Sequence, residues 1–290
     1  MKKTFLMTIF LVFALLIIGC QPTPTPAPTL APTEVPTATT APTEVPTAVP
    51  TEIALQDMSG ETVVLPEPAK RIVSIVPSNT ELVFAVGAGD ALVGRDDYST
   101  YPEAALSVQS IGSSMELNLE VIVSLEPDLV LAADLTAPEQ VKAMRDLGLT
   151  VYQLPNPTDF DSLYANILTI GALTGKTDQA QALVENLKAR VSQLQETLKA
   201  AETTPLVFYE LDATDPTKPW TAGAGTFVDM LITMAKGKNL GAEFEGAWVQ
   251  VSSEELIAKN PQIIILGSST YGGVKPEDVA ARAGWSEIQA

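Results

Sequence analysis

Apolar and polar residues follow a pattern along residues 70–290 that occurs twice. Glu120–Leu131 is echoed 134 residues later by Glu254–Ile265. In both copies a small polar residue (Asn118 or Ser252) stands two positions before the glutamate. A proline stands seven positions after it, followed by four mostly aliphatic residues. Each copy predicts a capped short helix that ends near the proline, and then a buried strand. The repeat therefore predicts two similar α/β lobes, each presenting one glutamate from the first turn of a helix.

Other apolar runs place the remaining elements of both lobes. In the first lobe, strands are predicted at 71–76, 91–94, 108–111, 128–133 and 150–154, and helices at 78–86, 118–126 and 136–148. The helix at 78–86 is predicted to begin with a capping box, Ser78–Glu81. In the second lobe, residues 206–211 predict a strand and residues 226–235 a helix. Strands that alternate with helices are typical of a mostly parallel sheet covered by helices on both faces.

Residues 159–201 have a helical pattern without strands. They contain no proline, and apolar residues recur at three- and four-residue steps. These apolar residues are Leu183, Leu187, Val191, Leu194 and Leu198. We therefore expect a connecting helical spine at 158–203, between an N-terminal lobe at 52–157 and a C-terminal lobe at 204–290. The C-terminal lobe has fewer predicted strands and is expected to be incomplete.

The N-terminus is not expected to belong to the fold. Two lysines precede an apolar run, Phe5–Ile18, that is too short to span a membrane comfortably. This pattern predicts a secretory signal peptide at 1–19. Its end resembles the lipobox of bacterial lipoproteins, which implies that Cys20 becomes the lipid-modified N-terminus. The alternative is an incidental cysteine.

Residues 20–51 are composed almost entirely of proline, threonine and alanine after Cys20, and include a repeat of ten residues. So much proline excludes helix and central strand, and there is too little large apolar surface to build a core. We expect an extended tether. At ~3.1 Å per residue, about 30 residues could reach up to roughly 90 Å from a membrane.

Composition excludes several classes of function. The chain has 35 acidic and 17 basic residues, a net charge of −18, which argues against nucleic acid as a partner. It has no histidine, and its one cysteine is assigned to the lipid anchor. Nearly all zinc sites and Ser-His-Asp or Cys-His machinery are therefore excluded. The P-loop-like Gly171–Thr177 has the wrong spacing and lies between helices, so a helix break explains it better.

No catalytic residue, metal site or cofactor is predicted, and the protein is not expected to be an enzyme. Carboxylates are plentiful, so a carboxylate-only hydrolase stays open, although no pair stands out for that role.

Several motifs resemble the iron-siderophore and cobalamin binding proteins of ABC importers, in the expected order and spacing. They are Arg71–Glu81, Tyr98–Pro102, Asn118–Glu120, Pro127–Val130, Thr226–Phe227 and Gly237–Asn239. The resemblance covers about residues 70–290. It implies the class III solute-binding fold, in which one long helix joins two Rossmann-like lobes and a metal chelate binds between them. It also implies that Glu120 and Glu254, one on each lobe, pair with arginines of the membrane permease. The alternative is that each carboxylate has only a structural role and stabilises its helix by ~0.3–1 kcal/mol through the helix dipole.

Around the ligand the chain most resembles the cobalamin-binding branch. Tyr98, Trp220 and Trp248 fall where that branch places aromatic residues against the corrin, and aromatic faces hold a large, nearly uncharged macrocycle well. For Trp248, burial in the lobe is the competing interpretation. One departure is Ala133, where the branch has a tryptophan. Ferric siderophores and haem are therefore the alternative ligands.

The resemblance predicts an extracytoplasmic lipoprotein, anchored through Cys20, that delivers its ligand to ABC permease and ATPase subunits. The expected ligand is cobalamin or a related corrinoid, and the protein is expected to act as a monomer. A cell-surface sensor that has lost transport is the alternative from another class.

Overall fold

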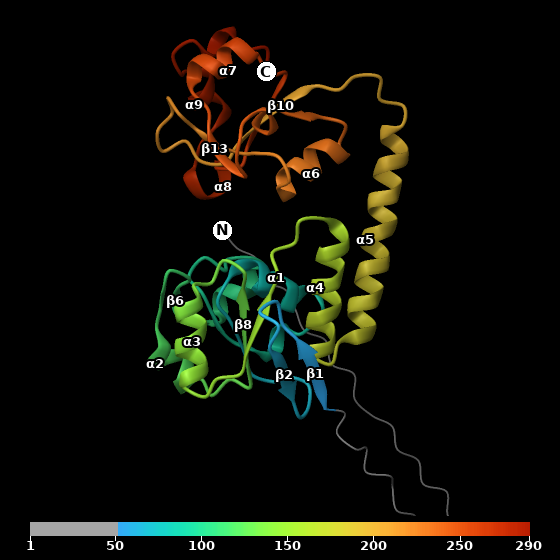
Figure 1. Cartoon of the computed structure of the whole chain (residues 1–290), viewed down its shortest axis with the longest axis vertical. Coiled ribbons are helices and arrows are strands. Elements are labelled where there is room, and N and C mark those ends of the chain that lie inside the picture. The colour runs from blue at the N-terminus through green and yellow to red at the C-terminus, as the bar shows by residue number, and fades with distance from the viewer. Residues whose placement is uncertain (1–51) are drawn as a thin grey trace, which may run out of the picture. The chain divides into compact units, whose positions relative to one another are not determined.

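The computed structural model describes residues 52–290, and residues 270 and 271 by their backbone only. The expected two α/β lobes with parallel sheets are present (Figure 1). The predicted signal peptide, Cys20 and the tether lie outside the described residues. Within the described part, no helix is both long and apolar enough to cross a membrane.

A five-stranded parallel sheet forms the centre of the N-terminal lobe. Its strands are β3 (Ile72–Ser74), β4 (Leu92–Arg95), β5 (Gln109–Ser110), β8 (Leu129–Ala133) and β9 (Val151–Leu154). The helices that follow them are α1 (Pro77–Ala85), α2 (Leu119–Ser124), α3 (Pro138–Asp146) and α4 (Phe160–Leu173). The spatial order is β5-β4-β3-β8-β9. The chain starts in the middle of the sheet at β3, builds outward to β5, and then returns to place β8 on the other side. The topological switch point therefore lies between β3 and β8.

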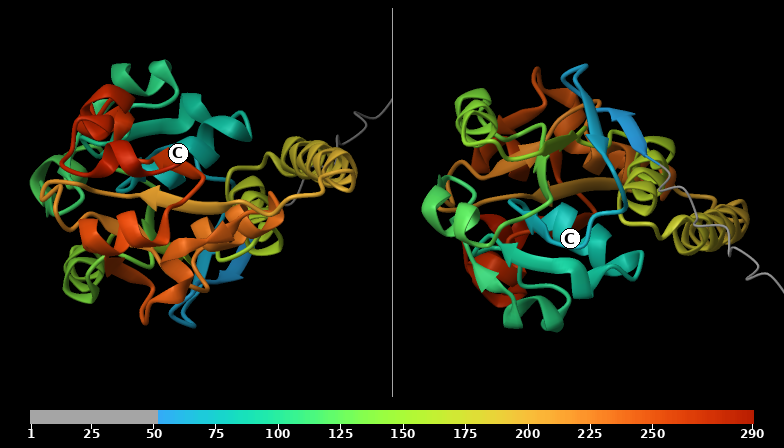
Figure 2. Two further views of the ribbon diagram at one scale, coloured as in Figure 1. Left: turned by 90° about the horizontal axis from the view of Figure 1, so that it is seen from above. Right: turned by 90° about the horizontal axis from the view of Figure 1, so that it is seen from below.

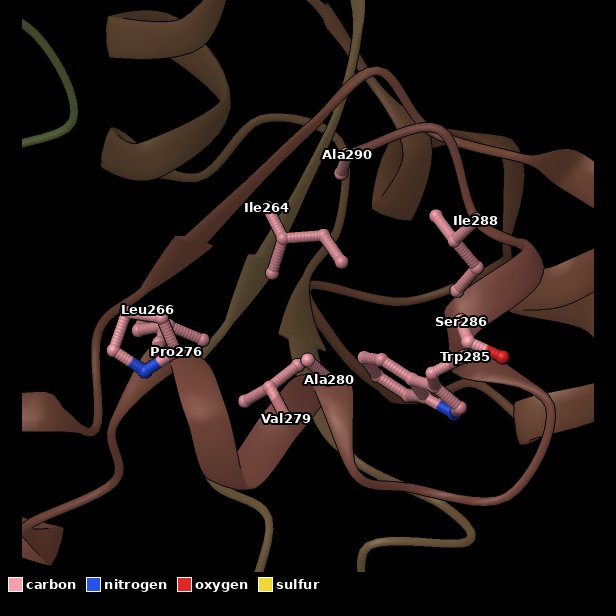
Figure 3. Close-up of a pocket in the computed structure, with 9 residues that line it drawn as sticks. All are labelled: Ile264, Leu266, Pro276, Val279, Ala280, Trp285, Ser286, Ile288 and Ala290. Atoms are coloured by element: carbon pink, nitrogen blue, oxygen red, sulfur yellow. The ribbon is translucent and has the colours of Figure 1, made fainter.

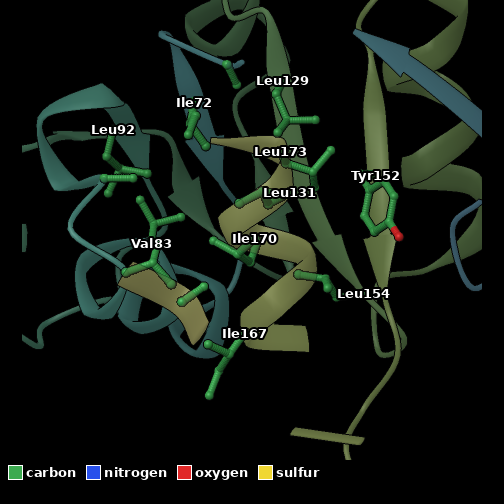
Figure 4. Packing of buried hydrophobic residues seen from close by; sticks show 14 of the residues in the cluster. Ile72, Val83, Leu92, Leu129, Leu131, Tyr152, Leu154, Ile167, Ile170 and Leu173 are labelled. Atoms are coloured by element: carbon green, nitrogen blue, oxygen red, sulfur yellow. The ribbon is translucent and has the colours of Figure 1, made fainter. Parts of the chain in front are cut away.

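Both faces of this sheet are buried, as expected for parallel strands. Ile72, Leu129 and Leu131 lie on one face and pack with side chains of α1, α4 and α5 (Figure 4). Val73 and Val130 lie on the other face and pack with Ile122 and Met144 of α2 and α3.

Two antiparallel hairpins in this lobe were not predicted from the sequence. One is β1 (Ile53–Gln56) with β2 (Thr62–Leu65), and the other is β6 (Gly112–Ser113) with β7 (Glu116–Leu117). The first hairpin is attached to the sheet by the Tyr152 hydroxyl, which donates to the Gln56 carbonyl at 2.9 Å. Buried Asp57 accepts from Arg145 at 2.8 Å.

Within the described residues, 3₁₀ turns occupy Gly89–Ala91, Glu103–Ser107, Leu240–Glu243 and Trp285–Glu287.

The region predicted as one spine contains two helices, α4 and α5 (Thr177–Leu198), which lie alongside each other (Figures 1 and 2). Gly175 separates them with a positive φ of 67°, so the helix break expected there is confirmed. A side chain at Gly171 would meet the Cβ of Ala180 at 2.4 Å, so glycine allows the two helices to approach closely. Because Ile167 and Ile170 of α4 belong to the first core, α4 is part of the N-terminal lobe.

The C-terminal lobe has a parallel sheet in the order β12-β10-β14 and a separate antiparallel ribbon. The sheet strands are β10 (Leu206–Glu210), β12 (Lys238–Asn239) and β14 (Ile263–Leu266), and the ribbon strands are β11 (Trp220–Ala222) and β13 (Trp248–Gln250). The helices are α6 (Phe227–Met234), α7 (Ser253–Lys259), α8 (Ser269–Gly272) and α9 (Pro276–Ala280). The buried strand predicted after the second copy of the repeat is wrong in its burial, because β14 lies at the edge of the sheet and its Ile263 and Ile265 are each 42% exposed. That this lobe is incomplete stays a prediction.

The repeat is reproduced down to the backbone. Asn118 caps α2 by accepting from the Val121 N–H at 3.0 Å, and Ser252 caps α7 in the same way at 3.2 Å. In both copies the residue before the proline is left-handed, with φ of 46° at Glu126 and 51° at Asn260. A left-handed residue that ends a short helix redirects the chain into the following strand.

The capping box predicted at Ser78–Glu81 is wrong. Helix α1 begins one residue earlier, at Pro77, and its N-cap Val76 has no side-chain cap. Proline suits the first helical position because its missing N–H would have no partner there. The Thr80 hydroxyl instead donates to Ser74 Oγ at 2.9 Å.

Glu243 joins two elements of the C-terminal lobe. Its carboxylate contacts Lys238 Nζ of β12 and Lys259 Nζ of α7, both at 2.5 Å, and its side chain is 25% exposed. The hydrogen bonds from Lys238 and Lys259 lower the pKa of Glu243 to about 2. A lowered pKa means that the stabilisation is present above the ordinary pKa of 4.5 and is lost as the pH falls toward 2.

We therefore expect Glu243→Gln to lower the free energy of unfolding by about 1 kcal/mol at pH 7, since solvent screens such pairs. The difference from wild type should shrink as the pH falls below 4.5. Urea unfolding at pH 7 and pH 3 measures both values, with Glu245→Gln as the control, because Glu245 is exposed and close by in the chain. A loss of equal size at both pH values would contradict this account.

Candidate ligand-binding site

The carboxyl ends of β3, β8 and β9 meet at one edge of the N-terminal sheet, where the chain forms a cavity of about 160 Å³. Open parallel sheets bind their ligands outside this edge, at the switch point. Helix α1 contributes Ser78, Asn79 and Glu81, the end of β8 contributes Ala133, and the turn after β9 contributes Asn156.

Two buried asparagines fix the walls of this cavity. Asn79 Nδ2 donates to the Ala132 carbonyl at 2.9 Å and so ties α1 to β8. Asn166 Nδ2 of α4 donates to the Pro155 carbonyl at 2.9 Å and holds the turn after β9. Because both amides are used in this way, the cavity has a defined shape.

Glu81 is the fifth residue of α1 and lies at the cavity wall. Desolvation by the surrounding protein raises the pKa of the Glu81 carboxyl group, although the residue as a whole is exposed. Its carboxylate makes no hydrogen bond or ion pair with any described residue.

Tyr98 lies on the loop after β4, at the same edge of the sheet, and is 62% exposed. Its backbone N–H donates to Asp96 Oδ2 at 3.1 Å, and the buried Asp96 carboxylate also accepts from the Ser99 hydroxyl. Ser99 Oγ in turn lies 2.9 Å from Thr80 Oγ1 of α1. Burial raises the pKa of Asp96, an effect that the hydrogen bond from Ser99 opposes. This buried network fixes the turn that presents the Tyr98 ring to solvent.

The structure brings Trp220 and Trp248 together on the β11–β13 ribbon. Trp220 pairs with Gln250, two residues beyond Trp248, so both indoles lie on one face of the ribbon at diagonal positions. Trp220 is 39% exposed and Trp248 is 52% exposed. Burial of Trp248 in the lobe, the competing interpretation, is therefore wrong. Trp248 is the first residue of β13.

A buried ion pair at the carboxyl end of β10 was missed by sequence reasoning. Arg282 donates through both terminal nitrogens to Glu210, whose side chain is fully buried. The guanidinium also lies 4.7 Å from the ring centroid of Trp285. Since 72 residues separate the partners, no local pattern could have revealed the pair. Arg282 is thereby neutralised and fixed in place.

The C-terminal lobe also contains an apolar cavity of about 380 Å³ beside β14. Figure 3 shows Ile264, Val279 and Trp285 directed toward the same space. None of the aromatic residues predicted to bind ligand lines it. We therefore place the candidate site at the carboxyl edge of the N-terminal sheet and on the tryptophan ribbon.

Glu120 and Glu254 occupy matching positions in the first turns of α2 and α7. Both residues are exposed, and neither carboxylate makes a hydrogen bond or ion pair with any described residue. Their docking role stays a prediction. Among the described residues, no group of three or more carboxylate, cysteine or histidine side chains could hold a metal ion.

A family model described as periplasmic binding protein matches residues 72–290. The chain belongs to this family. Periplasmic binding proteins bind solutes outside the cytoplasm and are not enzymes, so the family assignment agrees with the fold and with an extracytoplasmic location.

Two curated proteins are similar in sequence to this periplasmic binding protein. The Uncharacterized ABC transporter substrate-binding lipoprotein YvrC of Bacillus subtilis is 35% identical over 82% of this chain and 75% of its own length. The Cobalamin-binding protein of Halobacterium salinarum is 31% identical over 73% of this chain, but only 58% of that relative is spanned.

A solved structure shows a similar fold with a different named ligand. The periplasmic heme-binding protein RhuT from Roseiflexus, in apo form, has a TM-score of 0.68 against this chain at 28% identity. The match covers 77% of this chain and 86% of RhuT. Proteins similar to this chain are thus named for two different ligands, cobalamin and heme.

Proposed function

We propose that the protein is the extracytoplasmic substrate-binding lipoprotein of an ABC importer and captures cobalamin or a related corrinoid. The observation that carries the proposal is the pair Trp220 and Trp248, exposed on one face of a ribbon. Exposed indoles are costly in water unless a ligand covers them, and a flat macrocycle offers a matching apolar surface. The named ligand of the Halobacterium relative is consistent with this choice.

Haem or a ferric siderophore is the second candidate, because RhuT has a similar fold. Equilibrium dialysis of the full-length protein in detergent separates the candidates, with cyanocobalamin, haemin and a ferric hydroxamate in parallel. Saturable binding of cyanocobalamin alone supports the proposal. Binding of only an iron chelate moves the protein to the second candidate, and a folded sample that binds none of them favours a sensor.

The lipid anchor at Cys20 is part of the proposal and has its own test. Cells that express the protein are fed a radiolabelled fatty acid, and the protein is then isolated. We expect label on the wild type and none on Cys20→Ser. Equal labelling of both would place the lipid elsewhere.

A further inference from the structure

Polar side chains line much of the cavity at the switch point, in contrast to the aromatic part of the candidate site. We propose that it receives a neutral, hydrogen-bond-donating arm of the ligand, such as a primary carboxamide, with Glu81 as the acceptor, and that it thereby selects against ligands that carry a carboxylate there. This inference rests on the proposed function and deepens it, because it states what the site requires of the ligand's periphery.

The size of the cavity limits what it can hold. Pockets that enclose a whole small molecule measure about 300–1,000 Å³. At about 160 Å³ this cavity is too small for a macrocycle, but it has room for a short side arm. The macrocycle itself would then lie outside the cavity, at the edge of the sheet where Tyr98 is exposed.

The lining supplies polar groups without partners. Ser78, Glu81 and Asn156 make no side-chain hydrogen bond with any described residue, whereas Asn79 and Asn166 are already engaged. Leucine, alanine and proline side chains form the rest of the wall. A carboxamide fits this combination, because its NH₂ can donate to the carboxylate and its oxygen can accept from a hydroxyl or an amide.

The charge around the cavity is negative. No lysine or arginine lines it. Arg95, on a neighbouring strand at the same edge, is engaged with the carbonyls of Ala105 at 3.0 Å and Asp96 at 2.8 Å. Partial burial of the Glu81 carboxyl group at the cavity wall raises its pKa. A second carboxylate, brought in by a ligand, would face repulsion without a cation to offset it.

The test compares cyanocobalamin with derivatives in which one peripheral carboxamide is hydrolysed to a carboxylate. We expect at least one derivative to bind wild type about tenfold more weakly than cyanocobalamin. In Glu81→Gln this penalty should largely disappear, because the repelling charge is gone. Cyanocobalamin itself should bind this variant about fivefold more weakly, since a hydrogen bond to a neutral acceptor is weaker than one to a carboxylate.

Glu139→Gln on α3 is the matched control, because it removes an exposed glutamate from the first turn of another helix of the same lobe. Thermal melts confirm that each variant is folded, and Ser78→Ala gives a second variant of the cavity that leaves the charge intact. If wild type binds cyanocobalamin but every derivative binds equally well to wild type and Glu81→Gln, the inference is wrong and the proposed function stands. If wild type does not bind cyanocobalamin, the proposed function fails and the inference with it.

Discussion

Replacing Trp220 and Trp248 together with alanine is expected to weaken cyanocobalamin binding by at least about 100-fold. The two indoles share one face of the β11–β13 ribbon, so a flat ligand can cover both at once. Central aromatic residues at binding surfaces often contribute 2 kcal/mol or more, and each 1.4 kcal/mol is a tenfold change in affinity. Equilibrium dialysis or tryptophan fluorescence quenching measures the change. Each single variant should lose a part of the affinity.

Leu194→Ala is the control for this experiment. Leu194 is 64% exposed on α5, so its removal takes away a comparable exposed apolar side chain outside the candidate site. Its affinity should match that of wild type. A folded Trp220/Trp248 double variant with unchanged affinity would show that the ribbon does not bind the ligand, and would remove the main support for the corrinoid proposal.

Reversing the charge of Glu120 and Glu254 to lysine is expected to abolish uptake of radiolabelled cyanocobalamin by cells that depend on this protein. The affinity of the protein for cyanocobalamin should stay unchanged. Both carboxylates are exposed and without partners among the described residues, so they are free to meet cations of a permease. Opposite charges across an interface favour the correct encounter, and like charges oppose it by several kcal/mol.

The double variant Glu139→Lys/Glu255→Lys serves as the matched control. Like the test pair, it reverses one exposed glutamate in the first turn of a helix in each lobe, so it changes the net charge and the helix dipoles equally. Uptake should persist in this control. Equal loss in both double variants would mean a general charge effect, and full uptake in the Glu120/Glu254 variant would favour the sensor.

Much of the fold could be predicted because the signals are local. Asn118 and Ser252 cap their helices by bonding to an N–H three residues away, so the cap and its helix are both visible in a short stretch of sequence. Strands β8 and β14 each follow a proline that stops the preceding helix, but only β8 is buried, and β14 is partly exposed. The wrong capping box at Ser78 also came from a local pattern. In the structure the helix begins at Pro77, and the Thr80 hydroxyl within the supposed box donates to Ser74.

The candidate site was only partly visible in the sequence. Tyr98, Trp220 and Trp248 were found through the resemblance to a family. All three are exposed, and their role in ligand binding stays a prediction. Glu81 was seen only as a supposed helix cap. Its place in a cavity depends on Asn156, which is 75 positions away and reaches the same edge through β9.

The sequence by itself determined the two-lobe α/β plan, the matched glutamates and the absence of histidine chemistry, because periodicity, caps and composition act over a few residues. Only the tertiary structure decided that α4 joins the first core, that the two tryptophans share one face, and that Arg282 is neutralised by Glu210. Each of these depends on strands and helices pairing over long separations. Such pairing is selected by packing of the whole lobe and leaves no mark in any short stretch of residues.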